Sequence, residues 1–380
     1  MNCRSILFIG FLALSGVVSQ SAEMPGPVNF AIVGLVHDHA RGFIPSARGR
    51  TDIQLVGIVE ANQALVARYA KNYNLGTNLF FSSLDELLAK TNVQAVATFT
   101  STFDHKRVVE MCAPRGITVM MEKPLAVNME HARAIQAAAK KGNIQVLVNY
   151  ETTWYPSNTE AYSMVHDHHA IGDIRKVVVH DGHRGPQEIG CSADFLGWLT
   201  DPVQNGGGAL MDFGCYGADL ITWLMDGKKP QSVLAVTQQI KPEIYPKVED
   251  EATILLTYST AQGIIQASWN WAIDRKDMEI YGQSGYVLVP RKDLIKMRVA
   301  TSDVSGQRWK VSEETEKSPA PLTGSLGDPL SYLAAVVQGK VQAAGLSSLE
   351  LNMVVTEILD AAKESARTGK RVELAKSPGF

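Results

Sequence analysis

The sequence is poor in cysteine and carries no large excess of one charge. Only four of its 380 residues are cysteines, and the three that follow the N-terminal segment, Cys112, Cys191 and Cys215, make no disulfide framework and fit no zinc pattern. Thirty-six basic residues stand against 39 acidic ones, and the basic residues do not cluster. A nucleic-acid-binding protein is therefore excluded. The chain has no internal repeat or low-complexity tract, and its length allows about two domains.

The first 22 residues differ from the rest. Arg4 is their only charge, residues 5–18 are apolar, and residues 19–22 are small and polar. This order predicts a secretory signal peptide cleaved after Ser21 or Ala22, and the apolar run is short for a membrane span. We therefore expect a periplasmic or secreted protein with no membrane partner after cleavage. An uncleaved anchor is the alternative.

Residues 23–149 alternate between apolar strands and helical segments. Alternation of this kind predicts an α/β Rossmann domain with a doubly wound parallel sheet. The expected strands are 28–33, 53–59, 93–99, 117–120 and 146–148, and the expected helices are 39–47, 64–73, 84–90, 105–114 and 128–141.

The pattern changes in residues 150–380. A helix at 157–169 and a strand at 174–179 come first, followed by several strand-like runs with little helix between them. Such a run predicts an α+β domain with a large, mostly antiparallel open sheet. The runs cover 232–237, 252–258, 263–271, 278–281 and 286–290. We expect a surface hairpin or loop at 302–321, and a final helix at 349–368 that packs back.

Two motifs carry the chemistry. Lys123 follows the strand 117–120 within Glu122-Lys123-Pro124, at the strand end where open α/β sheets bind ligands, and proline ends the strand. About ninety residues later, a run of three glycines precedes Asp212 and Tyr216, which are four apart and therefore share one helix face. A lysine, an aspartate and a tyrosine together suit the proton transfer that accompanies hydride transfer between an alcohol and a ketone.

The two motifs, in this order and spacing, resemble those of the Gfo/Idh/MocA family of nicotinamide-dependent sugar oxidoreductases. The family pattern is Glu-Lys-Pro, then Gly-Gly-Gly-x-Leu-x-Asp-x-Gly-x-His, and Tyr216 stands at the histidine position. That variant resembles the glucose–fructose oxidoreductase and dihydrodiol dehydrogenase branch, in which a tyrosine is the proton donor. The resemblance implies catalytic roles for Lys123, Asp212 and Tyr216. We expect the Lys123 ammonium to bring the Tyr216 pKa from about 10 toward neutrality.

The cofactor loop departs from the Gly-x-Gly-x-x-Gly fingerprint. Gly34 is present, but Val36 and His39 occupy the places of the second and third glycines. We expect helix amides to meet the pyrophosphate, helped by His37 and His39, so that affinity weakens as pH rises through the imidazole range. Glu60 closes the second strand where an acid binds ribose hydroxyls, which favours NAD over NADP. The resemblance adds Thr100, Thr102, His105 and Glu122 to the cofactor site. His105 could instead be a surface residue.

Polar residues near the expected domain seam are candidate substrate contacts: Asn149, Tyr150, His183 and Arg184. Glu151-Thr152 stands where the family often has Arg-Phe, which argues against an anionic sugar. Trp269 and Trp271 could stack on a sugar or lie in the core. No metal is expected, because isolated histidine pairs without cysteine or carboxylate partners are weak signals.

The leading hypothesis is an NAD(H)-dependent oxidoreductase of a neutral sugar or glycoside. Two alternatives remain: a glycosidase with tightly bound NAD, and a non-catalytic sugar-binding protein. The resemblance also implies a homo-oligomer, either a dimer or a tetramer.

Overall fold

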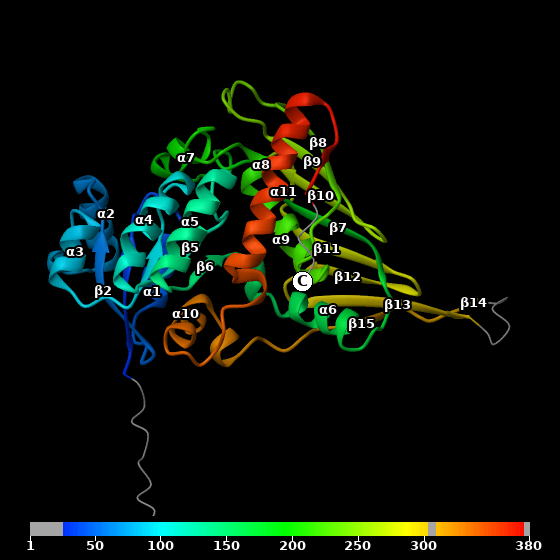
Figure 1. Ribbon diagram of the computed structural model, residues 1–380, viewed down its shortest axis with the longest axis horizontal. Helices are drawn as coiled ribbons and strands as arrows, with labels where there is room; N and C mark the ends of the chain where they lie inside the picture. Colours follow the sequence, from blue (N-terminus) through cyan, green and yellow to red (C-terminus); the bar gives the residue numbers. More distant parts are fainter. Residues whose placement is uncertain (1–25, 303–308, 376–380) are drawn as a thin grey trace, which may run out of the picture.

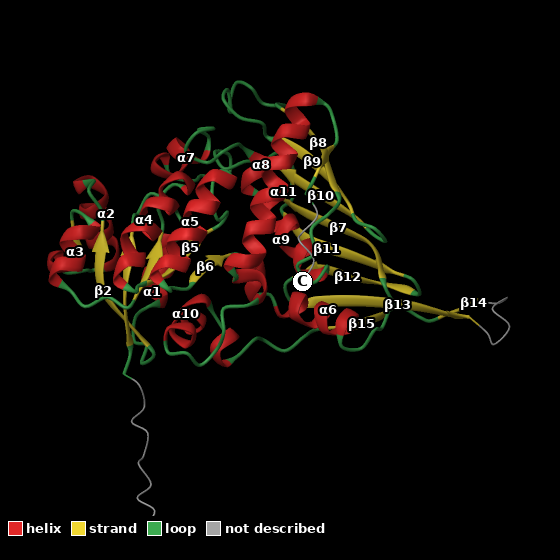
Figure 2. Ribbon diagram, viewed as in Figure 1, coloured by secondary structure: helices red, strands yellow, loops and turns green. Residues whose placement is uncertain are grey.

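The computed structural model describes residues 26–302 and 309–375. The expected signal peptide lies outside these residues. Two sheets stand side by side with helices packed between them (Figure 1; Figure 2 separates helices from strands). The architecture confirms the predicted fold class, a parallel sheet followed by a mostly antiparallel one.

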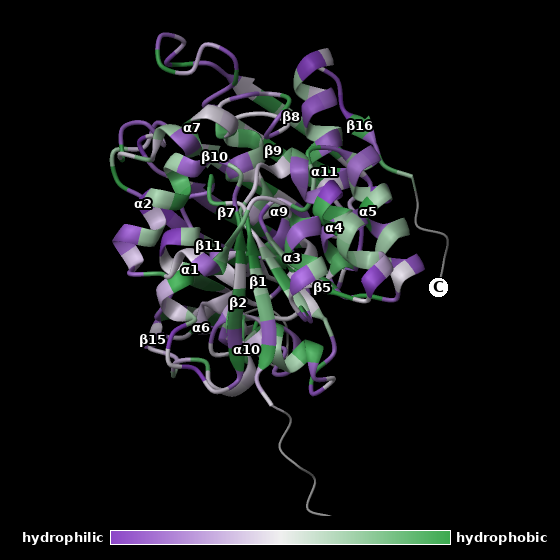
Figure 3. Cartoon of the chain, turned by 90° about the vertical axis from the view of Figure 1, so that its left-hand side faces the viewer, coloured by the Kyte–Doolittle hydropathy of each residue, from purple (hydrophilic) through white to green (hydrophobic). Residues whose placement is uncertain are grey.

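The first sheet has six strands in the order β3-β2-β1-β4-β5-β6, and every pair in it is parallel. Its chain order reverses between β1 and β4, and at such a switch point α/β sheets bind ligands. The strands are β1 (Val28–Val33), β2 (Ile53–Val59), β3 (Phe80–Phe81), β4 (Ala95–Thr98), β5 (Thr118–Glu122) and β6 (Val146–Asn149). Figure 3 shows that β1 and β2 are largely apolar, whereas the helices around them mix apolar and polar residues.

The helices of this half begin at capping side chains in most cases. Asn62 caps α2 (Gln63–Tyr73), Ser83 caps α3 (Leu84–Lys90) and Asn128 caps α5 (Met129–Gly142), each accepting from a first-turn amide. The remaining helices are α1 (Ala40–Ser46), which contains Pro45 and has no side-chain cap, and α4 (His105–Cys112). Short 3-10 helices occur at η1 (Thr77–Leu79), η2 (Thr102–Asp104) and η3 (Ala113–Arg115).

The second sheet runs β14-β13-β12-β11-β7-β10-β9-β8-β16, and β15 pairs with β13. Only β7 and β10 are parallel among these pairs. The strands are β7 (Ile174–Gly182), β8 (Ser232–Gln238), β9 (Glu251–Thr257), β10 (Gln262–Ser268), β11 (Arg275–Gly282), β12 (Gly285–Arg291), β13 (Leu294–Ser302), β14 (Trp309–Val311), β15 (Thr315–Lys317) and β16 (Val372–Glu373). The sequence analysis did not predict β13, in which polar residues such as Lys296 and Arg298 alternate with apolar ones, as in a sheet with one solvated face.

Helices of the second half cover the inner face of this sheet. Those that pack on the sheet are α6 (Pro156–His166), α8 (Ala209–Asp212), α9 (Gly214–Leu224) and α11 (Leu349–Thr368). Two further helices, α7 (Ala193–Leu199) and α10 (Pro329–Val337), pack elsewhere, and 3-10 turns occur at η4 (Glu151–Trp154), η5 (Gly324–Leu326) and η6 (Gly345–Ser347). The bounds of α11 match the prediction, whereas α7 and α10 were not predicted.

Two late segments tie the halves together. Helix α10 follows the second sheet in sequence, yet Leu330 and Leu333 belong to the apolar cluster of β1 and β2. From α11, Asp360 accepts the Met129 amide at 2.6 Å and the Lys363 ammonium donates to the Val127 carbonyl at 2.7 Å. The segment that follows Lys123 is therefore held by the last helix. Across residues 26–302 and 309–375, no helix is both long and apolar enough to cross a membrane.

Candidate active site

A buried ion pair joins the two sequence motifs. The Lys123 ammonium, just beyond β5, lies 2.5 Å from Oδ1 of Asp212 and 2.8 Å from the Asp212 carbonyl oxygen. The indole of Trp269 donates to Oδ2 of the same carboxylate at 2.9 Å. Burial disfavours both charges, but their mutual attraction outweighs it: the pKa of Asp212 is lowered and that of Lys123 is raised. Lys123 and Asp212 are therefore partners, and Trp269 is a core residue that orients the aspartate.

The helix carrying the second motif breaks between Asp212 and Tyr216. In a continuous α-helix the Tyr216 amide would donate to the Asp212 carbonyl. Instead it donates to Phe213 at 3.1 Å, and the freed carbonyl accepts from Lys123 and from the Cys215 thiol. The expectation of one continuous helix was wrong, because the ammonium competes for the backbone acceptor. The break supplies Lys123 with its second partner.

Glycines bring this break close to neighbouring backbone. Gly206 has a φ of +83°, and a Cβ there would lie 2.6 Å from the Val127 carbonyl. A Cβ on Gly208 would lie 1.9 Å from the Glu249 carbonyl. No side chain fits at either position, so the run of glycines lets α8 approach the loop that carries Lys123.

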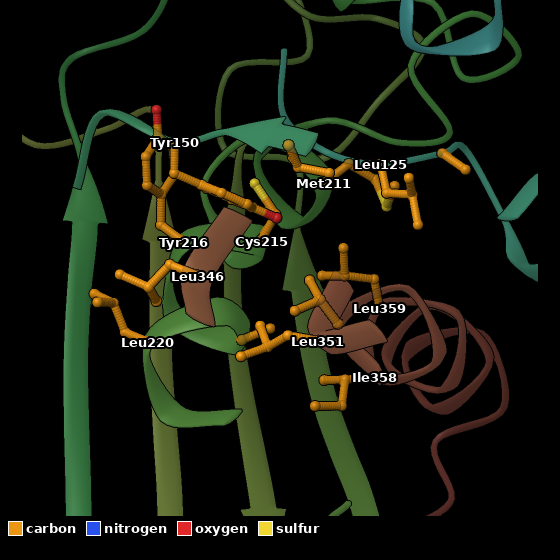
Figure 4. Packing of buried hydrophobic residues seen from close by; sticks show 14 of the residues in the cluster. Leu125, Tyr150, Met211, Cys215, Tyr216, Leu220, Leu346, Leu351, Ile358 and Leu359 are labelled. Atoms are coloured by element: carbon orange, nitrogen blue, oxygen red, sulfur yellow. The ribbon is translucent and has the colours of Figure 1, made fainter. Parts of the chain in front are cut away.

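Tyr216 lies between two lysines. Its ring centroid is 4.9 Å from the Lys123 nitrogen and 4.9 Å from the Lys276 nitrogen, and Tyr150 meets it edge-on at 5.4 Å. Figure 4 shows Tyr150, Cys215 and Tyr216 beside the apolar residues of α11. Burial, reinforced by the Glu151 carboxylate, raises the pKa of Tyr216 well above its usual value. The expected shift toward neutrality was wrong, because the ammonium groups lie over the ring and burial dominates.

These side chains line a cavity of about 310 Å³ at the seam between the sheets. The lining residues are His37, Asp38, His39, Lys123, His183, Pro186, Ile189, Cys191, Phe195, Leu199, Asp212, Phe213, Tyr216 and Lys276. We call it the inner cavity. Lys276 was missed in the sequence because it lies on a strand 60 residues beyond the motif, where an alternating polar residue reads as solvated.

The predicted substrate residues separate into two groups. His183 lines the inner cavity and packs edge-on against Phe213 at 4.8 Å. Asn149 instead donates to Glu122 at 2.9 Å, and Arg184 is exposed outside the cavity lining. Tyr150 is fully buried and its hydroxyl donates to Asn352 at 2.9 Å, so the expectation that it contacts substrate was wrong.

A second cavity, of about 550 Å³, lies at the switch point of the first sheet. Gly34, Val36, Glu60 and Thr100 line it, as predicted for a cofactor site. Gly34 has a φ of +83°, and a Cβ there would lie 2.7 Å from the Thr100 methyl group. The position, the close backbone approach and the acid at the end of β2 fit a dinucleotide.

Thr102 and His105 lie outside this lining, and both are buried. The Thr102 hydroxyl donates to Asn205 at 3.1 Å, whereas Nδ1 of His105 lies 3.2 Å from the Leu125 carbonyl. Burial lowers the pKa of His105 to about 4. The cofactor contacts expected for Thr102 and His105 are therefore absent from the cavity lining, and His105 does not lie on the surface either. Both side chains instead hold neighbouring loops in place.

The loop 34–39 is organised differently from the expectation. The first amides of α1, those of Ala40 and Arg41, donate to the carbonyls of His37 and Asp38, so they do not point to a phosphate. Burial lowers the pKa of His37 well below 6.5, which contradicts a phosphate-binding imidazolium at that residue. His39 is half-exposed, and its Nδ1 lies 3.0 Å from Oε2 of Glu122.

Helix α7 of the second half clamps this loop. Asp38 accepts both the Ser192 amide at 2.8 Å and its hydroxyl at 2.7 Å. Phe195 packs edge-on against the His37 ring at 4.6 Å, and the Trp198 indole donates to the Val36 carbonyl at 3.4 Å. The loop that departs from the fingerprint is therefore fastened to α7 through Asp38, the His37 ring and the Val36 carbonyl. The capping signal of Ser192, which accepts the Phe195 amide, could have revealed the helix.

Three possible metal ligands lie close together beside the inner cavity. Ligand atoms of His37, His39 and Glu122 are within 4.8 Å of one another. Each already has a partner, because His37 accepts the His39 amide at 3.1 Å and His39 bonds Glu122. Glu122 is held in turn by Asn149, which the Trp154 indole orients at 2.9 Å. These side chains therefore form a connected series of hydrogen bonds next to Lys123.

Comparison with known proteins gives the same two halves. Residues 28–150 match the oxidoreductase family with an NAD-binding Rossmann fold, and residues 160–288 match the GFO/IDH/MocA C-terminal domain. The trans-1,2-dihydrobenzene-1,2-diol dehydrogenase of Xenopus laevis is 25% identical over 322 residues, covering 82% of this chain and 90% of the relative. The human enzyme of the same name is 25% identical over 55% of this chain and 58% of its own length.

Two solved structures share the fold. Aldose-aldose oxidoreductase from Caulobacter crescentus, complexed with glycerol, superposes with a TM-score of 0.73 at 22% identity, covering 92% of this chain and all of the other. The WlbA dehydrogenase from Bordetella pertussis, in complex with NADH and UDP-GlcNAcA, superposes with a TM-score of 0.72 at 21% identity, covering 92% and 100%.

Proposed function

The chain belongs to the GFO/IDH/MocA family of NAD-binding oxidoreductases, and from that premise we propose that it interconverts an alcohol and a ketone on a neutral sugar or glycoside. One observation carries the proposal: the Lys123–Asp212 pair and Tyr216 converge on one cavity at the seam beside the dinucleotide site. Titratable groups that burial and specific partners perturb, gathered in a cleft, are characteristic of catalytic sites.

The nicotinamide of a bound NAD would supply the hydride chemistry. The protein supplies proton transfer and orientation. An ammonium has three donors, and Lys123 commits two of them to Asp212, which leaves one for a substrate oxygen. Tyr216 lines the inner cavity, and its hydroxyl, whose pKa burial raises, carries a proton with which it can hydrogen-bond to a substrate oxygen.

NAD is proposed as the cofactor in preference to NADP. Glu60 lines the cofactor cavity, and its two carboxylate oxygens accept the amides of Leu35 and Asn62 at 2.9 and 2.8 Å. This anchors a negative charge where a 2′-phosphate would have to lie. Ribose hydroxyls can donate to the same carboxylate, whereas a phosphate would be repelled.

A glycosidase with permanently bound NAD is the second candidate. The α7 clamp favours it, because a cofactor loop fastened to the second half hinders exchange of the dinucleotide. The two candidates share the oxidation step. In the first, the oxidised sugar and the reduced cofactor would be the products; in the second, the glycosidic bond would be cleaved and the hydride returned to the sugar, so that NAD stays bound.

One experiment separates these candidates from a non-catalytic sugar-binding protein. The purified protein is examined by ultraviolet absorbance and mass spectrometry for bound nicotinamide, then assayed with neutral sugars, glycosides, uronic acids and dihydrodiols. We expect NADH formation with a neutral sugar or glycoside. Glycoside cleavage without added NAD would favour the second candidate, and no bound cofactor and no turnover would sink both.

We also propose that residues 1–22 direct export and that the mature protein is a homo-oligomer. The first rests on the charged, apolar and small-residue order of that segment, and the second on the open outer face of the second sheet, where Val236 is exposed. N-terminal sequencing of protein from its native host and sedimentation equilibrium test them. An intact Met1, or a monomer at all concentrations, would contradict the respective proposal.

A further inference from the structure

A larger cavity adjoins the inner cavity. It has a volume of about 680 Å³, and His183, Phe213 and Lys276 line both spaces. We call it the outer cavity. Its other lining residues are Glu151, Tyr155, Gly182, Asp274, Arg275, Asp277, Pro290, Arg291 and Lys292. Resting on the proposed function, we propose that the outer cavity is a second saccharide subsite, so that the enzyme acts on glycosides or oligosaccharides rather than on free monosaccharides.

The sizes of the two cavities support an extended substrate. Sites for small molecules commonly measure about 300–1,000 Å³. The inner cavity, at about 310 Å³, lies at the lower end of this range and has space for a single sugar ring beside Lys123 and Tyr216. A second ring linked to the reacting one must extend past Lys276, because this residue borders both cavities.

The walls of the outer cavity are polar and balanced in charge. Lys276 pairs with Glu151, Arg275 pairs with Asp277 at 2.6 Å, and Arg291 pairs with Asp293 at 2.7 Å. Tyr155 also donates to Glu151 at 2.6 Å. Neighbouring donors and acceptors of this kind suit sugar hydroxyls, each of which both donates and accepts. An anionic ligand would find three of the four lining cations, Arg275, Lys276 and Arg291, already paired with a carboxylate.

Lys276 and Glu151 form the junction between the subsites. The Lys276 nitrogen lies 4.9 Å from the centroid of the Tyr216 ring, and its side chain is 26% exposed. The Lys276–Glu151 ion pair extends from the ring of Tyr216 into the outer cavity. It can therefore hydrogen-bond to hydroxyl groups of the two sugar rings that a glycosidic bond joins.

The test uses matched probes: glucose with cellobiose, and galactose with lactose. Calorimetry measures the affinity of the intact protein for each sugar, and initial rates with NAD give kcat/KM. In at least one of the two sugar pairs, we expect both the affinity and kcat/KM to be about tenfold or more higher for the disaccharide than for the monosaccharide. We expect Lys276→Met and Glu151→Ala to reduce that preference toward unity.

Lys296→Met is the matched control, because this lysine lies on β13 and pairs with Glu316 away from both cavities. It should leave the preference unchanged. Equal affinity for mono- and disaccharides in both pairs would overturn the subsite, as would a preference that survives both junction variants. The calorimetric measurement stands even if no sugar is oxidised, so failure of the subsite and failure of the proposed reaction are distinguishable.

Discussion

The inner cavity and the cofactor cavity, which lies at the switch point of the first sheet, are held together by different kinds of contact. Around the inner cavity, the essential pair is Lys123 and Asp212, and each residue belongs to one of the two family motifs. Around the cofactor cavity, the loop 34–39 departs from the fingerprint and is supported by α7, which belongs to neither motif. A motif predicts geometry where its own members are partners, and fails where the partner is supplied by a distant helix.

The largest effect is expected at the inner cavity, from removal of the Tyr216 hydroxyl. We expect Tyr216→Phe to lower kcat by about 10²–10⁴-fold, the usual contribution of a general acid or base. Its stability should stay close to that of the parent, because the described residues include no hydrogen-bond partner for this hydroxyl. Stopped-flow or steady-state rates and thermal melting check the two parts. Near-full activity would remove Tyr216 from the mechanism.

Breaking the buried ion pair should cost both stability and activity. Lys123→Ala leaves the Asp212 carboxylate buried without its cation, which typically destabilises a protein by about 3–5 kcal/mol. Urea unfolding measures the loss. The double variant Lys123→Met, Asp212→Leu should recover much of the stability while remaining inactive. If the double variant is as unstable as the single one, packing rather than charge explains the loss.

Buried His105, beside the Leu125 carbonyl in the loop that follows Lys123, should make the stability of the protein depend on pH. The folded pKa of His105, about 4, is below the unfolded value of about 6.5. Its contribution to stability is therefore complete above about pH 6.5 and falls as pH is lowered toward 4. The raised pKa of the Asp181 and Asp219 carboxyls acts in the opposite direction, so a single pH curve would mix these effects.

A difference between variants isolates the histidine. The free energy of unfolding of the parent minus that of His105→Gln should fall by about 1.4 kcal/mol per pH unit between pH 6 and 4.5. His168→Gln, the same substitution at an exposed position, serves as the matched control. If the free energies of unfolding of the parent and of His105→Gln depend on pH in the same way, the lowered pKa of His105 would be contradicted.

Cofactor preference is the smallest expected effect. Glu60→Ser combined with Asn62→Arg should shift the ratio of NAD to NADP affinity by about tenfold toward NADP, corresponding to about 1.4 kcal/mol. Calorimetry with both dinucleotides measures the ratio, and Glu364→Ser, at an exposed position of α11 outside the lining of the cofactor cavity, serves as control. Equal binding of NAD and NADP by the parent would sink the proposed role of Glu60.

The sequence predicted the sheets and the catalytic cluster better than the surroundings of the cofactor. Buried strands such as β1 are continuous apolar runs, and α11 begins at a capping serine, so local signals suffice for both. The burial of Tyr150, the neutral His37 and the helix break at Phe213 depend on contacts from other elements. No local sequence pattern indicates those contacts. Lys276 was missed for the same reason.

The α7 clamp bears on how long a dinucleotide stays bound. Ser192, Trp198 and the Arg68–Asp194 ion pair fasten the nucleotide half to the second half around the cofactor cavity. Escape of a bound dinucleotide would require these contacts to open together, so the residence time would be set by a domain motion more than by phosphate affinity. Such a protein could complete many turnovers with one dinucleotide where free nicotinamide cofactor is scarce, provided that each reduced cofactor is reoxidised in place.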